Sequence, residues 1–175
     1  GPEHRSRRDP CLALDAVRRG LKIAPDDPRL IEREGDVARR MGDPAAAART
    51  YERVAQLAPK DALVRVKLGE VYRDLGRSAD AARLLRDAVQ LDPETASYWN
   101  SLGMILAGSG DLAAGEQAFR QAGTRDGANA QYAFNLGLAL ARQNKRAEAE
   151  TAFRRALQID PGFAASATST RASGA

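Results

Sequence analysis

Few side chains in this sequence are equipped for catalysis or for holding a metal ion. His4 is the single histidine and Cys11 the single cysteine among the 175 residues. A Ser–His or Cys–His pair inside the fold, and a cysteine-rich metal site, therefore have no residues from which to form. Glu32 and Asp36 stand four positions apart on one helical face, but the surrounding sequence offers no apolar pocket that would make either carboxyl group a general acid. We predict a protein that is not an enzyme and requires no cofactor and no metal.

The charge balance permits weak attraction to anionic partners but does not require nucleic acid. Lysine and arginine number 27 against 23 acidic residues, a modest net charge of +4. Arginines recur in pairs, at Arg18, Arg19, Arg49, Arg53, Arg83, Arg86, Arg154 and Arg155. Acidic residues are interleaved with them and no aromatic platform accompanies them, so we expect a solvated face and no nucleic-acid surface.

No stretch approaches the roughly 20 apolar residues of a spanning helix, so membrane insertion is not expected. The lone thiol favours a cytoplasmic location.

A period of 34 residues organises the sequence. Five sets of positions share it, and they comprise small residues, turn formers and bulky apolar residues. The sets are Gly35, Gly69, Gly103 and Gly137; Gly42, Gly76, Gly110 and Asn144; Pro25, Pro59, Pro93, Gly127 and Pro161; Ala13, Ala47, Ala81, Gly115 and Ala149; and Val17, Tyr51, Leu85, Phe119 and Phe153. Agreement of five registers on one spacing indicates a repeat architecture.

Each set has a physical reason within a pair of antiparallel helices. Gly42 and its equivalents follow a helical pattern where the chain turns with positive φ, and Asn144 adopts that conformation readily. The prolines close the second helix of each pair. Small residues such as Gly69 and Ala81 let the two helices cross closely. Helix starts are marked by Asp43, Asp61, Ser78 and Asp111. The pattern predicts helices near 10–24, 28–41, 44–57, 61–75, 78–91, 95–109, 112–123, 129–143 and 146–159.

The repeat resembles the tetratricopeptide repeat family, whose unit is a 34-residue helix–turn–helix. The third unit carries the resemblance most plainly, with Trp99, Leu102, Gly103, Phe119 and Ala122. The resemblance implies an all-α, right-handed solenoid of stacked antiparallel helix–turn–helix hairpins. We expect one domain at 9–161, with a half repeat at 9–27 and repeats at 28–61, 62–95, 96–129 and 130–163. Residues 1–8 are expected to be a flexible segment with a tag remnant, and residues 164–175 a disordered or frayed tail.

The resemblance also implies a concave groove lined by the first helices, where a peptide would bind. This groove would be charged in its N-terminal half and amide-lined and apolar in its C-terminal half. The candidate partner-binding residues are Arg33, Asp36, Arg40, Glu70, Arg73, Asn100, Met104, Gln131, Phe134, Asn135 and Leu138. Asn100 and Asn135 would hydrogen-bond the peptide backbone, and Met104, Phe134 and Leu138 would form an apolar pocket. The alternative for Phe134 and Leu138 is packing between adjacent first helices.

Three classes of function remain open. A protein–protein interaction scaffold that binds a peptide segment of a partner in the groove is the leading hypothesis. The alternatives are a module that self-associates through uncapped ends into a homo-oligomer, and an accessory array of a larger enzyme or membrane complex. Some family members clamp a partner's terminal carboxylates in the groove, but acidic Glu32 and Asp36 occupy two of the corresponding positions and would repel such a ligand.

The junction between the third and fourth repeats departs from the pattern. Gly123 stands where other repeats have Leu21, Ala55, Val89 or Leu157, and Arg125 stands where they have Ile23, Leu57, Leu91 or Ile159. Loss of two apolar packing groups, together with glycine in the last helical turn, predicts an early helix end and a soft joint.

Overall fold

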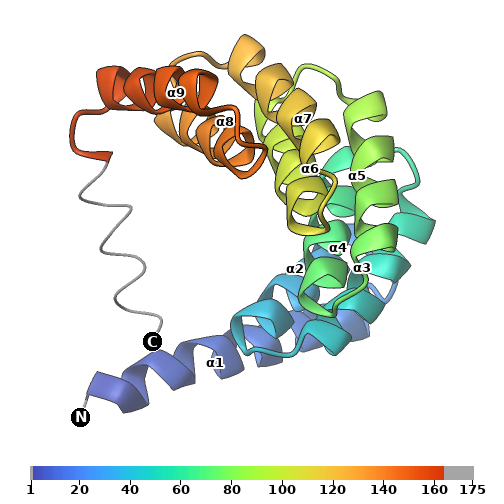
Figure 1. Cartoon of the computed structure of the whole chain (residues 1–175). Helices are drawn as coiled ribbons and strands as arrows, with labels where there is room; N and C mark the ends of the chain where they lie inside the picture. Colours follow the sequence, from blue (N-terminus) through green and yellow to red (C-terminus); the bar gives the residue numbers. More distant parts are fainter. Residues whose placement is uncertain (1, 164–175) are drawn as a thin grey trace. The chain divides into compact units, whose positions relative to one another are not determined.

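The computed structural model describes residues 2–163, with side chains from Pro10 onward. This part of the chain contains nine helices and no strands (Figure 1). The helices are α1 (Pro2–Ile23), α2 (Pro28–Arg40), α3 (Pro44–Leu57), α4 (Ala62–Asp74), α5 (Ser78–Leu91), α6 (Ala96–Gly108), α7 (Leu112–Arg125), α8 (Ala130–Arg142) and α9 (Arg146–Ile159). None of them is both long and apolar enough to cross a membrane.

The chain divides into two compact units, unit 1 (Gly1–Asp92) and unit 2 (Pro93–Ala175). In unit 1, α1 packs on α2, α2 pairs with α3, and α4 pairs with α5. In unit 2, α6 pairs with α7 and α8 with α9, while α7 also packs on α8 (Figure 1). This arrangement of stacked helical hairpins confirms the predicted all-α fold class.

The turns inside the hairpins follow the predicted chemistry. Gly42, Gly76 and Gly110 have φ values of 76°, 75° and 98°, and Asn144 has a φ of 61°. Aspartates cap several helices: for example, the Asp43 carboxylate accepts a hydrogen bond from the backbone N–H of Ala46 at 2.8 Å. Among the four predicted helix starts the exception is Ser78, which is the first residue of α5, so that Arg77 occupies the cap position without a side-chain hydrogen bond.

Two helix boundaries differ from the sequence-based prediction by more than one residue. Helix α1 begins at Pro2, so residues 2–8, expected as a separate segment, are part of it. The reason is local: Glu3, Arg5, Arg7 and Arg8 are good helix formers and nothing among them ends a helix. Pro10 lies inside α1 and is tolerated there. The tail expected at 164–175 lies outside the described residues.

The second difference is that the early end of α7 was wrongly predicted, because this helix continues to Arg125. The Arg125 guanidinium lies 4.9 Å from the centroid of the Trp99 ring, which is a cation–π contact. Its Nε donates to the backbone oxygen of Pro93, and its Nη1 donates to that of Gln121 at 3.1 Å. These contacts hold the last turn of α7.

A glycine on each first helix lies directly beneath a large side chain of the second helix. In α6, a Cβ atom added at Gly103 would lie 2.6 Å from Cε1 of Phe119, well inside van der Waals contact. Phe119 is itself buried, with 4% of its surface exposed. The ring therefore needs the empty space over Gly103, and the two helices can approach closely only because that space exists.

We expect Gly103→Ala to lower the free energy of unfolding by about 1–3 kcal/mol, because the new methyl group forces the Phe119 ring out of its site. Urea unfolding would measure this. The control is Gly108→Ala, also in α6, where an added Cβ meets no atom within 4 Å. That change should be neutral or stabilising by up to about 1 kcal/mol. Equal effects of the two substitutions would contradict the packing argument.

A second departure from the repeat pattern ties the hairpins of unit 2 together. Glu116 stands where two earlier repeats have buried alanines, and only 11% of its side chain is exposed. Its carboxylate accepts hydrogen bonds from Lys145 Nζ at 2.8 Å, Gln143 Nε2 at 2.9 Å and Arg120 Nε at 3.0 Å. The hydrogen bond from Lys145, with those from Gln143 and Arg120, holds the pKa of Glu116 below its usual range despite burial. The contacts anchor the α8–α9 turn to α7.

We expect Glu116→Gln to lower the free energy of unfolding at pH 7 by about 1–2 kcal/mol, because three charge-assisted or polar hydrogen bonds are weakened. A carboxyl group whose pKa is lower in the folded state than in the unfolded state contributes its full stabilisation above the ordinary glutamate pKa of about 4.3. That stabilisation is lost as the pH falls through the pKa of the folded state. The difference between the variant and the wild type should therefore shrink in acid. Glu150→Gln is the matched control, since the exposed Glu150–Arg154 pair one repeat later should contribute little. Urea titrations at several pH values would test both, and a difference that stays constant in acid would contradict the assignment.

Candidate functional site

The first helices of unit 1, α2 and α4, carry a network of paired charges. Lys67 Nζ on α4 lies 2.6 Å from Glu32 Oε1 and 2.8 Å from Asp36 Oδ1, both on α2. Burial alone would lower the pKa of Lys67, but the bonds to Asp36 and Glu32 outweigh it and raise the pKa overall. The lysine therefore stays charged and neutralises two carboxylates that stand four positions apart on the same helix.

The same network reaches the second helix of the first hairpin. The Tyr51 hydroxyl on α3 donates to Asp36 Oδ1 at 2.6 Å, and Arg39 Nη1 donates to Glu70 Oε2 at 3.1 Å. Burial of the Tyr51 phenol and its bond to Asp36 raise the tyrosine pKa well above its usual value. Asp36 and Glu70, two of the predicted groove residues, are thus already engaged by neighbouring helices.

The predicted arginines of unit 1 are less constrained. Arg33 and Arg40 are exposed on α2 and form no ion pair with any residue that the structure describes. Arg73 on α4 is exposed and lies 2.9 Å from Asp74, its neighbour in the chain. The face of α2 and α4 therefore combines internally satisfied carboxylates with arginines that extend into solvent.

The first helices of unit 2, α6 and α8, carry a chain of three amides. Gln131 Nε2 donates to Asn135 Oδ1 at 2.8 Å, and Asn135 Nδ2 donates to Asn100 Oδ1 at 2.8 Å. Asn135 is buried at 8% exposure between the other two. An amide can both donate and accept, so the chain leaves donor capacity on the Asn100 Nδ2 group at one end and acceptor capacity on Gln131 Oε1 at the other.

The apolar residues predicted for this face have different environments. Met104 on α6 is 38% exposed and Leu138 on α8 is 43% exposed, so both present free surface beside the amides. The Phe134 ring instead packs in a tilted arrangement against two other rings, with its centroid 5.4 Å from that of Phe153 and 5.2 Å from that of Phe163. Both rings belong to the same repeat as Phe134, so these contacts differ from the packing between adjacent first helices that the sequence left as the alternative.

Sequence reasoning missed part of this site. It placed Glu32 on the face without identifying Lys67 as its partner, and it treated Tyr51 only as a packing residue. The pairing had a detectable signal: Lys67 lies 35 residues from Glu32 and 31 from Asp36, about one repeat away, which puts the three on neighbouring first helices. No group of three or more histidine, cysteine or acidic side chains converges as a metal site among the described residues.

Comparisons with known proteins agree with the architecture. Family models described as tetratricopeptide repeat match residues 38–105, 96–129 and 130–163. A crystal structure of MamA superposes with a TM-score of 0.82 at 21% identity, covering 93% of this chain and 95% of that one. MamA residues 41–end from Desulfovibrio magneticus RS-1 give a TM-score of 0.82 at 21% identity, covering 91% and 93%. YrrB, described as a TPR protein with an unusual peptide-binding site, gives 0.76 at 20% identity, covering 95% and 86%. A comparison with curated protein sequences gives no match.

We expect Lys67→Met to lower the free energy of unfolding by about 1 kcal/mol, because Glu32 and Asp36 then repel each other at i,i+4 spacing. Methionine keeps the apolar stem of the lysine, so the loss of stability reports the removal of the positive charge. Urea unfolding with and without added salt would show it, with the loss shrinking in high salt. Arg33→Met, on the same face but unpaired, is the control and should change stability little. A salt-independent loss would point to packing as the cause.

Proposed function

Because the chain belongs to the tetratricopeptide repeat family, we propose that it is a protein–protein interaction scaffold whose first-helix faces bind an extended peptide segment of a partner. The observation that carries the proposal is the amide chain of unit 2. A buried amide held between two others keeps Asn100 and Gln131 in fixed orientations, and their outer groups match the alternating donors and acceptors of an extended backbone.

The surroundings of the amide chain support a peptide with apolar side chains. Met104 lies one helical turn beyond Asn100 on α6, and Leu138 lies one turn beyond Asn135 on α8. Both are partly exposed, and methionine adapts its shape to varied partners. A bound segment would place an apolar residue against this pair while its backbone bonds to the amides. YrrB, of similar fold, is described as having a peptide-binding site, which agrees with this assignment.

Unit 1 would contribute charge recognition. Arg33 and Arg40 extend into solvent on α2, and Arg73 does so on α4. Asp36 and Glu70 are satisfied within the network, so their role is to hold Lys67 and Arg39 in place, while the exposed arginines contact the ligand. We therefore propose that a segment bound on the α2–α4 face carries acidic residues.

Self-association is the second candidate, and α1 favours it. Leu12 is 65% exposed and Ile23 is 87% exposed on this helix, whose packing among the described helices is against α2. Large apolar side chains presented in this way gain free energy when a second copy covers them. The two candidates use different surfaces and can be separated by measurement.

We expect Asn100→Ala to weaken binding of peptides selected from a displayed random library by about fivefold to tenfold, because one backbone hydrogen bond is lost and Asn135 loses its acceptor. Isothermal titration would give the dissociation constants. Gln117→Ala, an exposed change on the second helix α7, is the matched control and should have no effect.

Two results would count against peptide binding on the α6–α8 face. One is selection of peptides that bind both variants equally. The other is failure to select any peptide while light scattering shows a mass that rises with concentration and falls back in an Ile23→Asp variant. The second result would support self-association through α1.

A further inference from the structure

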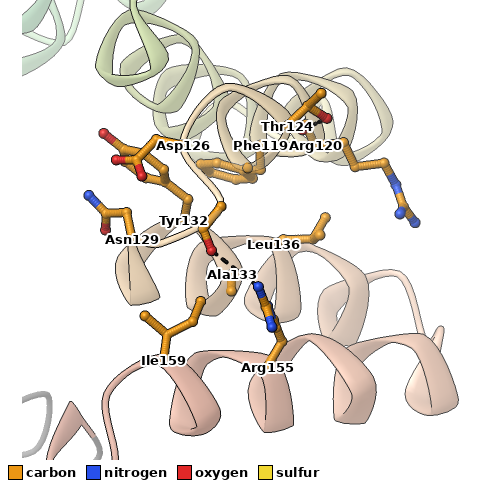
Figure 2. A pocket seen from close by; sticks show the side chains of 12 residues that line it. Phe119, Arg120, Thr124, Asp126, Asn129, Tyr132, Ala133, Leu136, Arg155 and Ile159 are labelled. Carbon is orange, nitrogen blue, oxygen red and sulfur yellow. Dashed lines mark hydrogen bonds between the residues drawn. The ribbon is translucent and has the colours of Figure 1, made fainter.

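A cavity of about 380 Å³ opens on unit 2, away from the amide chain, where the end of α7, the α7–α8 turn, the start of α8 and the end of α9 meet. Phe119, Tyr132, Leu136 and Ile159 form its apolar walls. Phe119 and Tyr132 are buried, at 4% and 8% exposure. Figure 2 shows these side chains around the cavity, with Arg155 of α9 reaching toward the α7–α8 turn.

The cavity exists because two side chains of the repeat pattern are missing at the same place. Gly123 on α7 and Ala133 on α8 both line it. One repeat earlier, the corresponding residues are Val89 and Trp99. A Cβ atom added at Gly123 would meet nothing within 4 Å, so neighbouring residues have not closed over the gap. The preceding repeat carries two large side chains at these positions, whereas this repeat leaves the volume open.

The rim of the cavity carries charged side chains at different edges. The Arg155 guanidinium makes one long hydrogen bond, from Nη2 to the Gly127 oxygen at 3.4 Å, and pairs with no carboxylate among the described residues. Arg120, also on the rim, is already bound by Glu116 and Glu148. Asp126 lies at another edge, where its carboxylate accepts from the Ala128 N–H at 3.2 Å. Arg155 is thus the charged group at the cavity that has capacity for an anionic ligand.

We propose that this cavity is a second binding site, which takes the C-terminal residue of a partner polypeptide when that residue is a branched aliphatic one. The side chain fills the volume vacated at Gly123 and Ala133, and the terminal carboxylate pairs with Arg155. A chain end carries its carboxylate on the same residue as the aliphatic side chain, whereas an internal segment would need a separate acidic residue to pair with Arg155, which is why a chain end fits better. The protein's own residues 164–175 contain only alanine, serine, threonine, arginine and glycine, so they offer no branched aliphatic side chain.

The probe for this site is the peptide acetyl-Ser-Gly-Ser-Leu with a free carboxylate, titrated into the ¹⁵N-labelled chain and followed by amide NMR shifts. We expect shifts at the end of α7, the start of α8 and the end of α9, with a dissociation constant on the order of 1 mM. The same peptide ending in glycine should bind about tenfold more weakly, because the apolar side chain is absent. The amidated leucine peptide should bind about fivefold more weakly, because the pair with Arg155 is lost.

Variants assign the binding to this cavity. Gly123→Leu refills the cavity and should weaken binding of the free-acid peptide at least about tenfold. Gly123→Ala leaves most of the cavity volume open and should change this binding less than about threefold. Both raise helix propensity, so the fold should be kept, and Ala133→Leu on the opposite wall serves if Gly123→Leu does not fold. Arg155→Gln should lower the affinity for the free-acid peptide to that for the amidated peptide, and it should leave the affinity for the amidated peptide unchanged.

Any of four results overturns the proposal. They are no shifts at about 5 mM peptide, equal affinity of the acid and the amide, unchanged affinity in the refilled variants, and tighter binding of free 4-methylpentanoate than of the leucine peptide. The last would mean that the cavity takes a small aliphatic acid instead of a chain end. None of these outcomes bears on peptide binding by the α6–α8 face, because the two sites share no residue.

Discussion

The fold depends on one close contact that every hairpin repeats: a first-helix backbone without a side chain lies against a large residue of the second helix. A Cβ atom added at Gly35 would lie 2.7 Å from the Tyr51 ring, and one added at Gly137 would lie 2.5 Å from the Phe153 ring. Such spacing leaves no freedom in the crossing of the two helices. Once that crossing is fixed in each repeat, the first helices present regularly placed faces on the side away from the second helices. The residues on these faces, which we call platforms, are free to vary.

The two units use that freedom differently. On α2 and α4 the platform is charged, and Lys67 and Arg39 neutralise carboxylates that would otherwise repel one another. On α6 and α8 it is built from amides, with apolar side chains beside them. Charged networks weaken with salt, whereas the amide chain does not depend on ionic strength. The two platforms should therefore respond to solution conditions in different ways although they share one scaffold.

The sequence was sufficient for everything that depends on the period. The hairpins, the turns at Gly42 and Asn144, and the positions facing away from the core follow from single residues repeated every 34 positions. The sequence was insufficient where the residue at a repeat position differs in type from its equivalents and makes a different kind of contact. Arg125 stacks on Trp99 at the end of α7, and Phe134 packs with Phe163 at the end of the last repeat. Such pairings join residues that no periodic pattern relates, so they become visible only when the helices are placed side by side. The amide chain lies between these cases, since its members were identified but their bonds to each other were not.

The stacking of Arg125 on Trp99 has a spectroscopic consequence. Trp99 is the single tryptophan of the chain and belongs to unit 2. Its emission therefore reports the environment of the α6–α7 hairpin alone, while far-ultraviolet circular dichroism reports the helices of both units. Repeat proteins need not melt as one cooperative block. If the two signals change at different denaturant concentrations, the boundary near Asp92 is also a boundary of cooperativity; if they coincide, the units fold and unfold together.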